Sequence, residues 1–208
     1  VVMVTVTTPY ILLIILFFKG ITLEGAGEGI KFYLTPDFSK ITDMDIWVAA
    51  ANQVFFSLSP AWGVAITFGS YLPLNEPIAK DAIWIAVINS ATSIFAGFVV
   101  FSVLGHMSWQ TGIPVEDVAV GGPELAFVVY PEALSLLPAP YVFSVMFFAM
   151  MMLLGIDSAF AIVELLIASL QETKWFRFWR KQVLAGIIVT FSFFGGLIMV
   201  TRAGIYWA

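Results

Sequence analysis

The sequence predicts an all-α fold, a polytopic bundle of membrane helices, and three observations support this prediction. Of the 208 residues, 61% are hydrophobic and only 11% are charged, and the mean hydropathy is +0.98. The apolar residues gather in five long runs, and a helix needs about 20 such residues to cross a bilayer. The net charge of −5 lies mostly between these runs. Soluble globular domains are less apolar and more charged than this chain.

Five segments are therefore expected to cross the membrane: 1–18, 46–72, 82–105, 141–170 and 183–201. The chain starts without Met inside the first of them, so we interpret residues 1–208 as a fragment of one transmembrane domain, whose missing N-terminal and C-terminal spans belong to the same protein. There is no cysteine, which excludes disulfides and thiolate metal sites. The nine Lys and Arg residues are scattered apart from one cluster, so nothing indicates nucleic-acid binding.

The first span ends beside Lys19, a residue type that is common at the membrane interface. The connection that follows, residues 20–45, contains three closely spaced glycines and more acids than bases. We expect a polar loop there.

The second span is interrupted at residues 52–63, NQVFFSLSPAWG. Pro60 cannot donate a backbone hydrogen bond, and the hydroxyls of Ser57 and Ser59 compete for backbone partners. Irregular backbone at membrane depth persists only where protein or a wet cavity satisfies it. A helix broken there exposes carbonyls that can bind a cation and N–H groups that can bind an anion. From this stretch alone, a proline kink inside a packed bundle is an equal alternative.

The third span has no charged residue, and its first half gathers four polar ones, Asn89, Ser90, Thr92 and Ser93. Asn89 and Ser93 lie four residues apart on one helix face, and Gln53 and Ser57 do the same on the second span. We expect two short polar ladders that face one another across this helix pair. Their amides and hydroxyls suit Na⁺ as acceptors and Cl⁻ as donors.

The connection from 105 to 140 is acidic in its first part and apolar, with repeated prolines, in its second part. We interpret the second part as short helices that pack back onto the bundle. His106 lies at the end of the third span, where we expect a solvated loop residue and not a ligand.

The fourth span contains two acids, Asp157 and Glu164. A carboxylate at mid-bilayer costs about 2.5–3.5 kcal/mol even on insertion scales, so it indicates a functional site. Leu154, Asp157 and Ser158 follow at helical spacing that keeps them near one face. Two alternatives are a hydrogen-bonded structural acid and an intramembrane enzyme that uses Asp157 and Glu164 as an acid pair. The second needs carboxylates on different spans, and every other span lacks one.

After Glu172 the chain reads TKWFRFWRKQ, which places four of the nine basic residues in one short loop. Cytoplasmic loops are enriched in Lys and Arg, so we expect the 171–181 loop in the cytoplasm. Alternation then makes the 20–45 and 106–140 connections external, in agreement with their acidic composition. The fifth span, 183–201, completes the chain.

Several segments together resemble the neurotransmitter:sodium symporter family. These are TTPYILLIILFFKGITLEGAGEGIKFYL, WVAAANQVFFSLSPAWGVAITFGSY, INSATSIFAGFVVFSVLG and LLGIDSAFAIVELL, which look like that family's fifth to eighth spans. The resemblance covers the whole chain and implies part of an inverted-repeat symporter fold whose second helix here is discontinuous. It also implies a protein that is not an enzyme.

The resemblance implies roles for individual residues. Two sodium sites would draw ligands from Ser57, Asn89, Leu154 (through its carbonyl), Asp157 and Ser158. A chloride site would draw on Gln53, Ser57, Asn89 and Ser93. Family members that do without chloride carry an acid where this chain has Ser93, so the resemblance implies chloride dependence.

The resemblance also marks positions around a substrate: Phe56, Ser59, Trp62, Ser158 and Ile162. Trp62 replaces the usual phenylalanine and resembles the SLSAAWG of glycine-transporting members, which implies a small substrate, although Pro60 departs from that string. A cytoplasmic gate would include Ser70, Tyr71 and Glu172.

The function that we expect is a sodium-coupled and chloride-dependent symporter of a small molecule (an amino acid, an amine or an osmolyte) in the plasma membrane. It would work by alternating access around the broken second span, in contact with membrane lipid. A transport-silent regulatory or scaffold member of the same family is the alternative.

Overall fold

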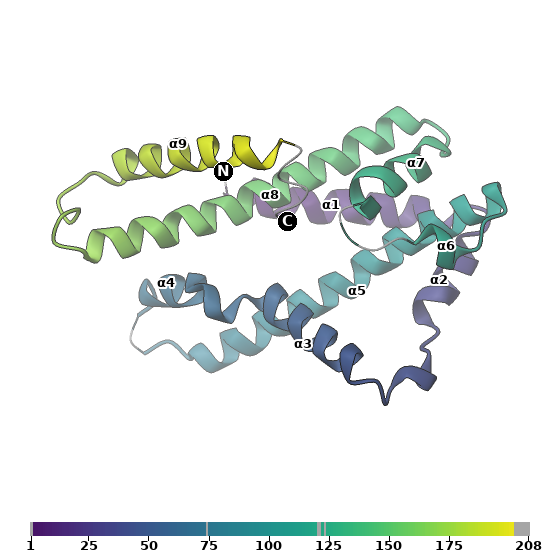
Figure 1. The fold of residues 1–208 in the computed structure, drawn as a ribbon, viewed down its shortest axis with the longest axis horizontal. Helices are drawn as coiled ribbons and strands as arrows, with labels where there is room; N and C mark the ends of the chain where they lie inside the picture. Colours follow the sequence, from purple (N-terminus) through teal and green to yellow (C-terminus); the bar gives the residue numbers. More distant parts are fainter. Residues whose placement is uncertain (1, 74, 120–121, 123, 202–208) are drawn as a thin grey trace. The chain divides into compact units, whose positions relative to one another are not determined.

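The structure is a computed structural model that describes residues 2–73, 75–119, 122 and 124–201, and its regular elements over those residues are all helices (Figure 1). The chain divides into two compact units. The first unit comprises Val1–Leu58 and Pro77–Ile156, and the second comprises Ser59–Glu76 and Asp157–Ala208. Each unit is described by itself.

The first unit contains eight elements and the start of a ninth. These are α1 (Val2–Ile21), α2 (Ala26–Leu34), η1 (Phe38–Lys40), α3 (Met44–Leu58), α5 (Ile78–Thr111), α6 (Val115–Val118), the π-helical η3 (Leu125–Val129), α7 (Tyr130–Ser135) and the first part of α8 (Pro140–Glu172). The second unit contains η2 (Pro60–Trp62), α4 (Val64–Ser70), the remainder of α8 and α9 (Lys181–Met199).

Four helices in the described part of the chain are long and apolar enough to cross a membrane: Met3–Ile21, Ile78–Thr111, Pro140–Glu172 and Lys181–Met199. They match four of the five expected spans, and the prediction of an all-helical, partly polytopic bundle is confirmed at this level. The remaining one, the second expected span at 46–72, is divided into α3 and α4. The third is longer than the expected 82–105, because the helix continues until Gly112 adopts a left-handed conformation, with φ of +73°.

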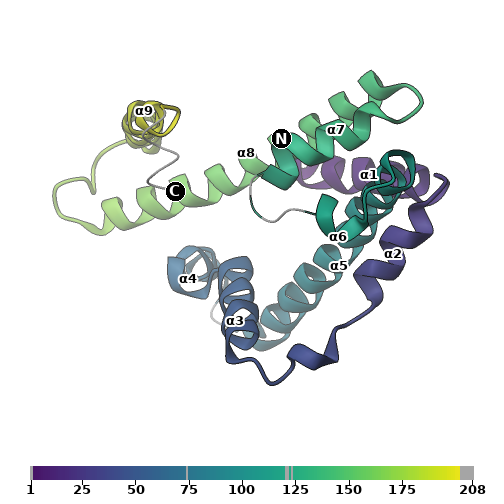
Figure 2. The same cartoon turned by 45° about the vertical axis from the view of Figure 1, so that its right-hand side comes forward.

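The core of the first unit forms around the C-terminal half of α5, whose Val99, Val103 and Leu104 are at most 1% exposed. Leu16 of α1 and Leu134 of α7 are also part of this core. Figures 1 and 2 both show α1, α2 and α6 beside this half of α5. The expectation that the 106–140 connection forms short helices packed on the bundle is confirmed by α7.

The expectation of a polar loop throughout residues 20–45 is wrong, because these residues include α2. This helix lies so close to α5 that a Cβ on Gly29 would overlap the carbonyl oxygen of Phe101. A Cβ on Gly105 of α5 would likewise overlap the backbone of Gly29 on α2. The absence of side chains at both positions therefore allows the two backbones to touch.

The expectation for His106 is also wrong, because this residue is 6% exposed and lies inside α5. Its Nδ1 is 2.7 Å from the carbonyl oxygen of Glu24, and its Nε2 is 3.1 Å from Nε2 of Gln110. A carbonyl can only accept, so Nδ1 carries the proton and Nε2 accepts from the Gln110 amide. His106 is thus a structural side chain that joins α5 to the turn before α2.

Candidate functional site

The interruption of the second expected span lies between Leu58 and Val64. Ser59 adopts a left-handed conformation with φ of +49°, and Gly63 does so with φ of +79°. Between them, Pro60–Trp62 makes one 3₁₀ turn, in which the N–H of Trp62 donates to the Ser59 carbonyl at 3.2 Å. A non-glycine residue with positive φ is uncommon and costs free energy, so it persists only where its surroundings require it. The break is therefore a specified feature of this backbone.

Gly63 has a second reason to lack a side chain. A Cβ at this position would lie 3.3 Å from Cδ1 of Leu165, which belongs to the same unit. The N–H of Thr67 then donates to the Gly63 carbonyl at 2.9 Å and starts α4. The glycine thus supplies the turn and allows α4 to begin close to α8.

The first unit brings together two of the predicted site residues from different helices. The amide Nδ2 of Asn89 on α5 donates to Oγ of Ser57 on α3 at 2.7 Å. One turn further along α5, Oγ of Ser93 donates to the backbone carbonyl of Asn89 at 3.0 Å. Gln53 lies one turn before Ser57 on α3. The two polar ladders predicted from the sequence therefore meet at one hydrogen bond, which leaves Oδ1 of Asn89 available as an acceptor.

Asp157 and Glu164, the two acids in the interior of α8, have different surroundings. Asp157 is half-buried, and its carboxylate makes no hydrogen bond or ion pair with any residue in the described part of the chain. The carboxylate of Glu164, in contrast, has two partners. Its Oε1 accepts from the hydroxyl of Tyr71 at 2.7 Å and from Nζ of Lys181 at 3.0 Å. All four residues belong to the second unit.

Tyr71, Glu164 and Lys181 form a cluster that joins the end of α4 to α8 and α9. Nζ of Lys181 lies 5.6 Å from the centre of the Tyr71 ring, within the range of a cation–π contact. The Glu164 side chain is 31% exposed and that of Lys181 is 55% exposed. The ion pair is thus open to solvent in this chain and depends on salt accordingly.

The other predicted gate residues are not part of this cluster. Oγ of Ser70 donates to the Thr67 carbonyl at 2.7 Å, inside its own helix. Glu172 is the last residue of α8. Lys181 was predicted only as part of the basic loop, because 17 residues separate it from Glu164 and no local periodicity relates them. The turn of the α8–α9 hairpin brings them together.

The positions predicted to surround a substrate lie on three elements. Phe56 is on α3, whereas Ser59 and Trp62 belong to the break. Ser158 and Ile162 lie one turn apart on α8, and Leu154 precedes Ser158 by one turn on the same helix. These positions fall in both units.

Comparison with known proteins gives concordant matches. The family described as "Sodium:neurotransmitter symporter family" matches residues 1–208. The "Sodium- and chloride-dependent glycine transporter 1" of Xenopus laevis is 45% identical over 206 residues, which are 98% of this chain and 32% of that protein. The "Sodium- and chloride-dependent glycine transporter 2" of the same organism is 44% identical over 204 residues, 97% of this chain and 26% of that protein. The chain therefore spans about a third or less of these relatives.

Proposed function

The chain belongs to the sodium:neurotransmitter symporter family, and from this premise we propose that the whole protein is a Na⁺-coupled and Cl⁻-dependent symporter of a small amino acid. Two relatives with the same domain are named sodium- and chloride-dependent glycine transporters. Membership of a transporter family argues against the alternative of an intramembrane enzyme that uses Asp157 and Glu164 as an acid pair. The pairing of Glu164 with Lys181 agrees with this, because an acid held in an ion pair is not free to act with Asp157 as an acid–base couple.

The hydrogen bond between Asn89 and Ser57 is the observation that carries the proposal. It joins an amide of α5 to a hydroxyl of α3, one residue before α3 ends at the break. With Nδ2 engaged, Oδ1 of Asn89 is the acceptor that a sodium ion requires. Hard cations of this kind prefer oxygen ligands.

Asp157 is proposed as a ligand of the second sodium ion, together with the Leu154 carbonyl and the Ser158 hydroxyl. An acid without a partner in an apolar helix is costly unless a cation neutralises it. Leu154, Asp157 and Ser158 follow one another within about one turn of α8, which suits a single ion.

Chloride is proposed to bind at Gln53, Ser57, Asn89 and Ser93. None of these side chains is charged, and each amide or hydroxyl can donate a hydrogen bond to an anion. The bound chloride ion then supplies the negative charge that an acidic side chain would otherwise supply at this site. The position of Ser93, one turn from Asn89, supports this assignment.

The substrate is proposed to lie beside the break, among Phe56, Ser59, Trp62, Ser158 and Ile162. The positive φ values at Ser59 and Gly63 interrupt the helical hydrogen-bond pattern between Leu58 and Val64, and backbone groups of this break are proposed to bind the charged ends of an amino acid. Tryptophan at position 62 is bulkier than the phenylalanine that is usual in the family, so a small substrate such as glycine is proposed. Tyr71, Ser70 and Glu172 are proposed as part of the cytoplasmic gate.

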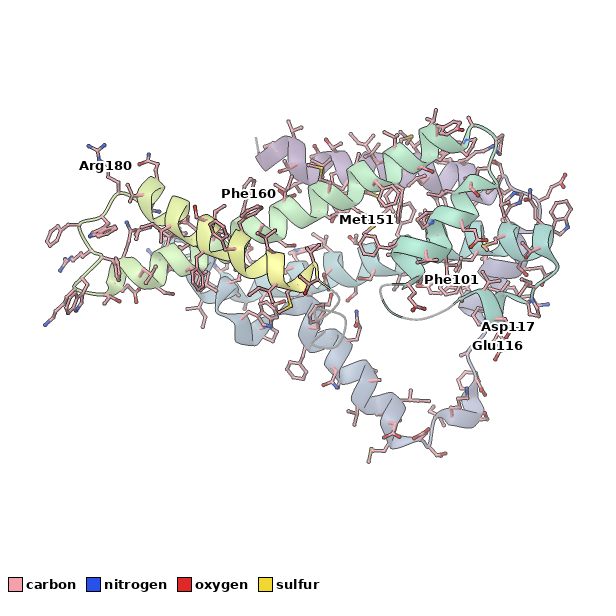
Figure 3. All side chains as sticks on the ribbon, turned by 45° about the horizontal axis from the view of Figure 1, so that its top comes forward. Phe101, Glu116, Asp117, Met151, Phe160 and Arg180 are labelled. Carbon is pink, nitrogen blue, oxygen red and sulfur yellow. The ribbon has the colours of Figure 1, made fainter. Side chains whose placement is uncertain are left out.

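The proposal is tested by Na⁺-dependent uptake of labelled glycine by the full-length protein in proteoliposomes. Asp157→Ala should abolish uptake, because the carboxylate neutralises the ion. Asp117→Ala is the matched control, since Asp117 is an exposed acid of the external connection (Figure 3), and it should transport as the wild type does. Uptake that survives in Asp157→Ala at wild-type Na⁺ affinity would contradict the sodium assignment.

Ser93→Glu tests the chloride dependence of glycine uptake in the same proteoliposomes. A fixed negative charge should allow uptake to continue when chloride is replaced by gluconate. Continued dependence on chloride would contradict the anion site. If the wild type moves no substrate, a Na⁺-induced rise in Tm still distinguishes a transport-silent member that binds ions from a protein without the sodium sites.

A further inference from the structure

The connection between α8 and α9, residues 173–180, is a compact series of turns. The N–H groups of Phe176 and Arg177 both donate to the carbonyl of Thr173 at 3.2 Å, and that of Trp179 donates to Phe176 at 3.0 Å. The side-chain amide of Gln171 donates to the Trp179 carbonyl at 3.3 Å, which ties the loop to the end of α8. We call these residues the α8–α9 loop, and its backbone is organised by its own hydrogen bonds.

The aromatic residues of the loop divide into two pairs. Phe176 and Trp179 contact each other edge to face, with ring centres 5.4 Å apart. Trp175 and Phe178 are instead 84% and 89% exposed, among the highest values for large apolar side chains in the described chain. Two rings are thus held outward by a turn that keeps the other two together.

Three cations alternate with the two exposed rings along the loop. Lys174, Arg177 and Arg180 form no ion pair with any residue that the structure describes, whereas Lys181, the next residue, is bound to Glu164. Figure 3 shows the Arg180 side chain directed away from the helices. The loop therefore presents unpaired positive charge and exposed aromatic surface together.

From these observations we propose that the α8–α9 loop is a binding site for anionic lipid headgroups of the cytoplasmic leaflet. The loop joins two helices that are each long and apolar enough to span the membrane, so it lies at headgroup level. Arg binds phosphate through paired N–H donors, and Trp is enriched at the boundary of bilayer and water. The proposal depends on the membrane orientation given above and is independent of ion coupling.

A lipid surface fits this loop better than an acidic protein segment does. The exposed rings alternate with the cations along the loop, at positions 174, 175, 177, 178 and 180, and all five side chains are exposed. A surface with negative headgroups above acyl chains accommodates both, because cations contact phosphate and rings enter the apolar boundary. A soluble acidic peptide would leave Trp175 and Phe178 in water.

The test uses the full-length protein purified in detergent and fluorescent phosphatidylserine, with binding followed by anisotropy. Each Lys or Arg near an anionic surface contributes about fivefold in affinity, so K174Q/R177Q/R180Q should weaken binding on the order of 100-fold. W175A/F178A, which keeps every charge, should weaken it by a smaller factor. Fluorescent phosphatidylcholine should bind the wild type no better than it binds the triple variant.

K19Q/K31Q/K40Q is the matched control, because it removes three cations from the opposite end of the expected topology. It should bind phosphatidylserine as the wild type does. Equal binding by wild type and the loop variant, or equal loss in both triple variants, would overturn the proposal. Displacement of the lipid by inorganic phosphate alone would also overturn it, since that result indicates a soluble-anion site.

Folding and ion binding are checked on the same samples. A monodisperse elution profile and a wild-type Na⁺-induced shift in Tm show that the loop variant is folded with intact ion sites. Loss of lipid binding with a normal Na⁺ response supports the loop proposal alone. A missing Na⁺ response in the wild type would instead contradict the proposed function and leave the lipid result valid.

Discussion

The two halves of α5 differ in what surrounds them. In the C-terminal half, Val99, Val103 and Leu104 are almost fully covered by the first unit's own helices. In the N-terminal half, Ile83, Trp84 and Ile85 are each more than 60% exposed in this chain, and Asn89 contacts α3 through a single side-chain hydrogen bond. One helix thus combines a packed scaffold with a polar face that carries the proposed ion ligands. Substitutions in the C-terminal half should change stability, and substitutions in the N-terminal half should change ion binding.

Asn89→Ala gives the largest expected effect in the site half. Mutation of a residue that only orients a metal ligand already costs about 10–100-fold in affinity, so loss of a proposed direct ligand should cost at least that in the concentration of Na⁺ that half-saturates uptake. The amount of folded full-length protein should not change, because Asn89 lies outside the core. An unchanged half-saturating Na⁺ concentration, or a loss of folded protein without a change in that concentration, would contradict the division of α5 into a scaffold half and a site half.

Gly29→Ala gives the next largest effect and addresses the scaffold half. The new methyl group would meet the backbone of α5 at Phe101 and Gly105, and overpacking of this kind costs about 1–3 kcal/mol. Gly27→Ala is the matched control, since nothing lies within 4 Å of its Cβ position on the same helix. It should raise stability by about 0.5–1 kcal/mol, because alanine favours a helix more than glycine does. Thermal unfolding of the detergent-purified protein measures both, and equal Tm values would contradict the close packing of α2 on α5.

Tyr130→Phe gives the smallest expected effect. The Tyr130 side chain is 2% exposed, and its hydroxyl has no hydrogen-bond partner among the described residues. Burial raises the pKa of this hydroxyl, so it stays protonated at neutral pH. Removal of an unsatisfied polar atom should leave Tm unchanged or slightly higher. A loss of more than about 1 kcal/mol would show that the hydroxyl has a partner in the remainder of the protein.

Most of the fold could be predicted from the sequence because long apolar runs and a proline inside one of them are local signals. The helix α2 could not be predicted in this way. Its glycines are poor helix formers, and the helix depends on backbone contact between Gly29 and Gly105, which are far apart in the sequence. The interpretation of His106 failed for a related reason, since it depended on where α5 ends, and the helix continues to Thr111.

The candidate site likewise contains features that local spacing predicts and features that depend on contacts between distant residues. The i, i+4 spacing of Asn89 and Ser93 predicted the polar face that the structure contains, and a proline beside Ser59 predicted the break. The partner of Glu164 could not be predicted, because Lys181 reaches it only through the α8–α9 hairpin. Spacing along one helix is readable from sequence, whereas pairing between helices depends on tertiary structure. The ligand roles of Ser57, Asp157 and Ser158 stay predictions.

The hydrogen bond from His106 to Glu24 has a consequence for the order of assembly during synthesis. The two residues are 82 positions apart, so Glu24 leaves the ribosome well before its partner exists. At about 5–20 residues per second, this interval lasts roughly 4–16 s. During that time the glycine-rich surface of α2 has no α5 to pack against. The scaffold of the first unit therefore closes late, after α3 and the break have already been made.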